Sequence, residues 1–116
     1  MILVDTSVWI DHFRDHDDAL SRALEDGEVL IHPLVVGELA CGNLRNRAEI
    51  LDLLGALPLA REATHDEVLA FIERRKLMGR GIGYIDAHLL AAAVLTPWTR
   101  LRTHDKRLAR LAAELQ

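Results

Sequence analysis

Four carboxylates in this sequence stand where they could do chemistry. Asp5 directly follows the apolar run at residues 2–4, and Asp105 follows a second strand-like run near the C-terminus. Glu38 is the only charged residue between positions 34 and 42, and Asp86 is the only carboxylate between positions 82 and 93. A carboxylate among apolar neighbours is costly to desolvate unless a cation or hydrogen-bond donors meet it. These four therefore stand apart from the other acidic residues.

The chemistry that four such groups could perform follows from their charge. Several carboxylates in one cleft repel each other and would take up protons unless a divalent cation offsets the charge. A ligand set made only of oxygen atoms favours Mg²⁺ or Mn²⁺ over zinc. With one or two such ions the fitting reaction is phosphodiester hydrolysis, in which the metal activates a water and stabilises the leaving oxygen. The sequence therefore predicts catalytic and metal-binding roles for Asp5, Glu38, Asp86 and Asp105.

Each of these residues also has a purely structural interpretation. Asp5 could cap the helix that follows it, and Asp86 could interact with the positive N-terminal end of its own helix dipole. Glu38 could sit at a rim and face solvent. Taken residue by residue, the sequence leaves both interpretations open, and it is the joint placement of the four that favours a site.

The elements that must position these acids alternate between strands and helices. Apolar β-rich runs predict strands at 2–4, 29–31 and 98–103, with a weaker extended segment at 57–59. Periodicity and caps predict helices that begin near residue 8 and then span about 17–26, 33–42, 45–55, 64–78, 84–95 and 105–115. This order predicts one domain over residues 1–116, an α/β fold built as a three-layer α/β/α sandwich around a mainly parallel sheet. Ligands bind beyond the carboxyl ends of strands in such sheets, where Asp5 and Asp105 would meet.

Composition excludes some classes of protein. The formal net charge is 14 − 18 = −4, which argues against a protein that holds nucleic acid through a broad basic face. It does not argue against a nuclease, because bound cations reverse the local sign. Cys41 is the only cysteine, so we expect a small packing residue, no internal disulfide and a reducing cytoplasm. The longest apolar run, residues 89–95, is far short of the ~20 residues that a membrane span needs, and no signal peptide is readable.

Four segments together resemble a known family. They are Val4-Asp5-Thr6-Ser7-Val8-Trp9-Ile10-Asp11, Glu38-Leu39-Ala40-Cys41-Gly42, Tyr84-Ile85-Asp86-Ala87-His88-Leu89 and Thr103-His104-Asp105, in that order. The pattern resembles the PIN-domain ribonucleases, and most closely the VapC toxins of bacterial toxin–antitoxin pairs. The resemblance covers essentially the whole chain.

The resemblance implies a function and a set of roles. It implies Mg²⁺- or Mn²⁺-dependent cleavage of single-stranded or looped RNA by a type II toxin, with a 5′-phosphate left behind. Asp5 and Asp86 match the family's most dependable metal ligands, Glu38 matches its helical glutamate, and Asp105 matches its least uniform acid. Thr6 and Thr103 would orient a ligand or a phosphate oxygen. The implied partners are a cognate VapB-like antitoxin, whose C-terminal segment fills the acidic cleft, and a second copy of the chain, giving a homodimer and a heterotetramer or larger assembly with the antitoxin.

Two other classes of function compete with this one. A phosphoacceptor α/β domain would need paired acids after the first strand, and Asp5 is followed there by Thr6-Ser7. A non-catalytic module that acts only through protein partners would not need acids at all four positions.

Two other motifs in the sequence say less about function. Gly79, Gly81 and Gly83 are expected to form a hinge or a close-packing loop, since no Walker motif accompanies them. The basic residues at 74–76 and Arg80 could touch RNA or could be a solvated helix end.

Overall fold

A short parallel sheet lies at the centre of the computed structural model, which describes residues 1–116. Its strands are β1 (Ile2–Val4), β2 (Val29–Leu30) and β3 (Arg100–Arg102), in the order β2-β1-β3. Ile2 of β1 is in register with Val29 on one side and Arg100 on the other. A single parallel bridge joins Ile31, just after β2, to Leu59. Of the extended segment expected at residues 57–59, only this bridge forms. All three strands run the same way, so their carboxyl ends meet at one edge.

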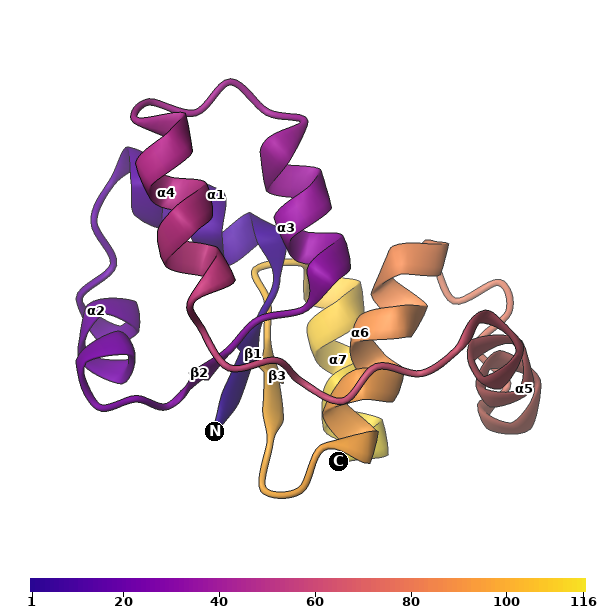
Figure 1. Ribbon diagram of the computed structural model, residues 1–116. Helices are drawn as coiled ribbons and strands as arrows, with labels where there is room; N and C mark the ends of the chain where they lie inside the picture. The colour runs from indigo at the N-terminus through magenta and orange to yellow at the C-terminus, as the bar shows by residue number, and fades with distance from the viewer.

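Seven helices cover the two faces of this sheet. They are α1 (Thr6–Arg14), α2 (Asp18–Glu25), α3 (Pro33–Ala40), α4 (Arg47–Gly55), α5 (His65–Arg75), α6 (Tyr84–Leu95) and α7 (Lys106–Leu115). Helices α1–α4 gather on one side of the sheet and α5–α7 on the other (Figure 1). This is the three-layer α/β/α sandwich that the sequence predicts.

Local sequence signals explain where most helices begin. Pro33 stands in the first turn of α3, where a missing N–H costs nothing. Thr64 caps α5 and forms a capping box with Glu67, as predicted. Asp5 and Asp105 are the N-caps of α1 and α7. Two of the predicted metal ligands, Asp5 and Asp105, therefore also act as helix N-caps.

Several predicted boundaries are wrong by two or more residues. Helix α1 begins at Thr6 rather than near residue 8, and α4 begins at Arg47 rather than at residue 45. Helix α5 ends at Arg75 rather than Met78, because Lys76 adopts a left-handed backbone with φ 55°. Helix α3 ends at Ala40 instead of continuing to residue 42. Strand β3 begins only at Arg100, since Trp98 has φ 58° and lies in the turn before it. Left-handed residues other than glycine are not readable from propensity.

The core is built around α6. All residues from Ala87 to Ala93 of this helix are buried, which explains why its sequence is apolar on every side. Leu89 packs with strand and α1–α4 residues in the larger core, and Leu90 packs with Leu108 and Leu111 of α7. Helix α6 thus joins both layers to the sheet and fixes its N-terminal Asp86 in place. No helix of the structure is long and apolar enough to cross a membrane.

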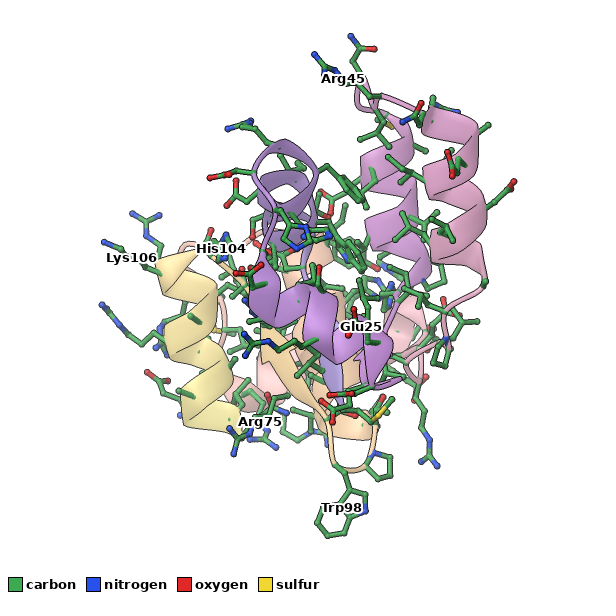
Figure 2. All side chains as sticks on the ribbon, turned by 90° about the vertical axis from the view of Figure 1, so that its left-hand side faces the viewer. Glu25, Arg45, Arg75, Trp98, His104 and Lys106 are labelled. Carbon is green, nitrogen blue, oxygen red and sulfur yellow. The ribbon has the colours of Figure 1, made fainter.

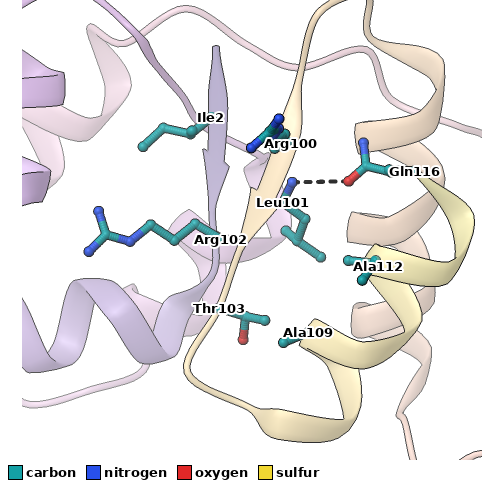
Figure 3. A pocket seen from close by; sticks show the side chains of 9 residues that line it. Ile2, Arg100, Leu101, Arg102, Thr103, Ala109, Ala112 and Gln116 are labelled. Atoms are coloured by element: carbon teal, nitrogen blue, oxygen red, sulfur yellow. Dashed lines mark hydrogen bonds between the residues drawn. The ribbon is translucent and has the colours of Figure 1, made fainter.

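The outer edge of β3 is closed by the last residue of the chain. The Gln116 side-chain amide donates to the Thr99 carbonyl at 2.6 Å and accepts from the Leu101 N–H at 3.3 Å. These are the two bonds that one residue of an added parallel strand would make. Beside them lies a groove of about 530 Å³ between β3 and α7, lined by Ile2, small alanines and Thr103 (Figure 3). This groove contains none of the four acids and reaches the candidate site only through Thr103.

Candidate active site

Asp5 is the most firmly held of the four carboxylates. It ends β1 in an extended conformation and is only 6% exposed. Its Oδ1 accepts from the Thr6 N–H at 2.7 Å, and its Oδ2 accepts from the hydroxyls of Ser7 at 3.1 Å and Thr103 at 2.6 Å. Three donors compensate for the lost hydration of the carboxylate. Asp5 is therefore a buried carboxyl group whose orientation is fixed by hydrogen bonds.

Glu38 reaches the same place from α3. Its Oε1 accepts from the Thr6 hydroxyl at 2.7 Å, so the residue next to Asp5 orients it. The side chain is exposed. The sequence left open whether Glu38 is buried or faces solvent at a rim, and the structure shows it exposed, because α3 keeps Val35 and Leu39 in the core and turns Glu38 outward.

Asp86 and Asp105 complete the group from the other side of the sheet. Asp86 lies in the first turn of α6, half-buried, and its Oδ2 accepts from the Gly83 N–H at 3.1 Å. Asp105 is exposed, and its Oδ1 accepts from the N–H groups of Arg107 and Leu108 at the start of α7. Its own N–H donates to Thr103 at 3.0 Å. The Thr103 hydroxyl thus joins Asp5 to the backbone of Asp105.

The electrostatics of Asp86 report the proximity of all four groups. Burial raises the pKa of the Asp86 carboxyl, and the negative charges of Asp5, Asp105 and Glu38 raise it further. The hydrogen bond from Gly83 opposes this shift and does not cancel it. Like charges raise a carboxyl pKa only when they lie within electrostatic reach. The fold therefore brings the four sequence-predicted acids into one region.

The side chains suit a hard divalent cation in their chemistry, since all four offer only carboxylate oxygens. They do not form a ready-made cage, because no group of three or more His, Cys, Asp or Glu side chains is arranged to hold a metal ion as it stands. The carboxylates are linked through hydroxyls and backbone N–H groups rather than through each other. The region is therefore a set of separately anchored oxygen donors with an uncompensated negative charge.

Hydroxyl side chains do more in this site than the sequence indicates. Ser7, which the sequence reasoning missed, donates to Asp5 and accepts from the His104 N–H at 3.1 Å. Thr6 and Thr103 hold the carboxylates of Glu38 and Asp5 instead of pointing to free space. Hydroxyls within two residues of a candidate acid are the signal that could have found them. At the rim, the His104 ring pairs with Asp11 of α1.

The structure also shows where the cysteine, the glycine loop and the nearby basic residues lie. Cys41 is exposed at the end of α3, so the prediction that it packs in the core is wrong. Gly81 lies against the Arg107 side chain, which confirms a close-packing loop. Among the basic residues near that loop, Arg80 forms a two-pronged pair with Glu114, and Arg75 lies over the ring of Phe71.

The fold and the acid cluster together define a small α/β domain with carboxylates gathered at the carboxyl ends of a parallel sheet. The PIN-domain family profile matches residues 2–114, and the chain belongs to that family. The chain is also 51% identical to Ribonuclease VapC32 of Mycobacterium tuberculosis over 114 residues, in both strain CDC 1551 and strain H37Rv. The match covers 98% of this chain and 92% of the relative.

Proposed function

We propose that this protein is a Mg²⁺- or Mn²⁺-dependent endoribonuclease that acts as the toxin of a type II toxin–antitoxin pair. The observation that carries the proposal is the hydrogen-bond network that holds Asp5, Glu38 and Asp105 in one region through the hydroxyls of Thr6 and Thr103. In the same region, burial and the three neighbouring carboxylates raise the pKa of Asp86. A cluster of this kind is unfavourable for stability alone and suits a site that receives a cation. The family membership and the ribonuclease named among its relatives support RNA as the substrate.

Each acid has a role in this proposal. Asp5, Glu38, Asp86 and Asp105 would hold the metal, with Asp5 and Asp86 as the inner ligands. When bound, the metal supplies an activated water and stabilises the charge on the leaving oxygen. Thr6, Ser7 and Thr103 are positioning residues that are expected to keep the carboxylates from turning away.

The orientation of the ligands depends on hydroxyl donors. The Asp5 carboxylate receives hydrogen bonds from two side-chain hydroxyls and one backbone N–H, so it cannot rotate without losing a bond. Partners of this kind around metal ligands tune affinity by about 10–100-fold.

The proposed partners follow from the charge of the site. We propose a VapB-like antitoxin whose cationic segment enters the acid cluster, since a guanidinium pairs with two carboxylate oxygens where a metal would sit. We also propose that the chain forms a homodimer, with a heterotetramer or larger complex once the antitoxin binds, and that it acts in the cytoplasm.

The direct test is RNA cleavage with and without metal. Structured RNAs are incubated with the protein in Mg²⁺ or Mn²⁺ and then in EDTA, in parallel with Asp5→Asn and Asp86→Asn. We expect cleavage only with metal, and a rate at least about a hundredfold lower in both variants, because each loses a metal ligand. Asp52→Asn is the matched control, since Asp52 is an exposed acid on α4 away from the cluster. Equal cleavage by Asp86→Asn would contradict the proposal.

A further inference from the structure

One face of α7 carries three cationic side chains beside the acid cluster. We propose that Lys106, Arg107 and Arg110, here named the α7 basic face, bind the phosphates of the RNA backbone next to the site of cleavage. This inference rests on the proposed function and deepens it, because it assigns the surface along which the substrate lies.

The charges of the α7 basic face are available for a ligand. All three side chains are exposed, and none has a carboxylate within 4 Å. Arg80 and Arg102, by contrast, are neutralised by Glu114 and Asp17. In a chain of net charge −4, three unpaired cations on a single helix face form a local positive surface.

The start of α7 places this surface at the rim of the acid cluster. Asp105 is the residue before the helix, and its Oδ1 accepts from the Arg107 N–H at 2.9 Å. Lys106 projects outward from the N-terminal end of α7, near His104 in the loop before the helix (Figure 2). Lys106 and Arg110 are four residues apart, so they share one face and span about 6 Å of helix axis. A phosphate held there would lie close to the proposed ligand Asp105.

The side chain of Arg107 lies against Gly81. A Cβ on Gly81 would lie 2.7 Å from Cδ and 2.9 Å from Nη1 of Arg107, so any side chain at position 81 would displace the guanidinium. Two residues further on, the Gly83 N–H binds Asp86. The loop at residues 79–83 therefore contacts the Arg107 side chain through Gly81 and the proposed metal ligand Asp86 through Gly83.

The physical reason for such a face is the sign of the neighbouring site. Four carboxylates repel a phosphate until a metal compensates them, and one or two ions hold only the reacting phosphate. The flanking phosphates need cations of their own, and Arg is well suited because its planar fork pairs with phosphate oxygens. The basic cluster at the end of α5 is less well placed, since Arg75 lies away from His104 and Lys106 (Figure 2).

Salt-dependent RNA binding tests the proposal. The probe is a labelled single-stranded RNA of mixed sequence, bound to the Asp86→Asn protein in Mg²⁺ so that binding is separated from cleavage. We expect Arg107→Ala to weaken binding about tenfold, as loss of a charge-assisted hydrogen bond should. We also expect the slope of log K against log salt to fall by about 0.7 for each lost phosphate contact. Arg45→Ala is the control, because Arg45 lies far from α7 (Figure 2).

A pair of glycine variants isolates the position of Arg107 from its charge. Gly79 and Gly81 have similar positive φ angles of 71° and 83°, but a Cβ on Gly79 meets nothing within 4 Å. Both Gly79→Ala and Gly81→Ala should lower Tm by similar amounts, because both strain the backbone. Only Gly81→Ala should weaken RNA binding, since only there is Arg107 displaced.

The outcomes separate this inference from the proposed function. If the wild-type protein cleaves RNA with metal but Lys106→Ala, Arg107→Ala and Arg110→Ala bind RNA with unchanged affinity and salt slope, the α7 basic face is refuted and the proposed function stands. If the wild-type protein does not cleave RNA under any metal condition, the proposed function itself fails. Equal RNA affinity of Gly79→Ala and Gly81→Ala would refute the role of the glycine contact.

Discussion

Replacing Thr103 by valine removes a hydroxyl that serves two partners and changes the shape of the side chain very little. The Thr103 hydroxyl donates to Asp5 at 2.6 Å and accepts from the Asp105 N–H at 3.0 Å. A hydrogen bond to a charged group contributes about 1.5–3 kcal/mol and a neutral one about 1 kcal/mol. Because the contact is only partly buried, we expect a loss near the lower end, about 2 kcal/mol.

Thermal unfolding of the metal-free protein measures this loss. For a domain of this size a change of 1 kcal/mol moves Tm by about 4 °C, so Thr103→Val should unfold about 8 °C below the wild type. The same variant should also bind Mn²⁺ about 10–100-fold more weakly, because Asp5 loses a partner that orients it. The Tm tests what the Thr103 hydroxyl contributes to stability, and the Mn²⁺ affinity tests what it contributes to metal binding.

The matched control is Thr103→Ser, which keeps the hydroxyl and should stay close to the wild type in both measurements. The reasoning would be refuted if Thr103→Val matched Thr103→Ser in Tm and in Mn²⁺ affinity. Ser7 lies 3.4 Å from Thr103 and also donates to Asp5. The double variant with Ser7→Ala should therefore lose more than the sum of the two single variants, since the second change leaves Asp5 with only one donor.

Three further predictions concern stability. The folded-state pKa of Asp86 is raised, so its contribution to stability is present below the ordinary pKa of 3.8 and is lost as pH rises through the folded value. Asp86→Asn should therefore stabilise the metal-free protein at neutral pH and make its free energy of unfolding depend less on pH. Urea unfolding at several pH values measures both effects. Gln116→Ala should lower the free energy of unfolding by about 1 kcal/mol and speed hydrogen exchange of the Leu101 amide, which the Gln116 side chain protects. Thr64→Ala should cost about 1 kcal/mol through its capping box while RNA cleavage stays unchanged, a combination checked by Tm and activity together.

Much of the fold could be predicted because its signals are local. The capping box at Thr64, the proline at the start of α3 and the apolar length of α6 are each written within a few consecutive residues. The ends of α5 and β3 could not be predicted in this way. They depend on the left-handed backbone of Lys76 and Trp98, a conformation that residues other than glycine rarely adopt.

The sequence indicates which acids come near one another but not the contacts that support them. Acids at the carboxyl ends of parallel strands must converge, so Asp5 and Asp105 follow from topology alone. The hydroxyls of Ser7 and Thr103 come together only when β1 and β3 pair, across almost the full length of the chain. Whether Glu38 is buried or exposed was left open by the sequence, because its exposure depends on how α3 docks rather than on its neighbours in sequence. Side-chain direction at a helix rim is a tertiary property.

Calorimetric titration with Mn²⁺ tests most directly whether the four acids form a metal site. Titrations in two buffers of different ionisation enthalpy report both the affinity and the number of protons released. Because burial, together with the charges of the other three carboxylates, raises the pKa of Asp86, Mn²⁺ should displace protons from the cluster at low pH and release fewer as pH rises. Asp86→Asn should bind Mn²⁺ far more weakly and release fewer protons than the wild type. Absence of Mn²⁺ binding by the wild type, or identical binding by Asp86→Asn, would contradict the account.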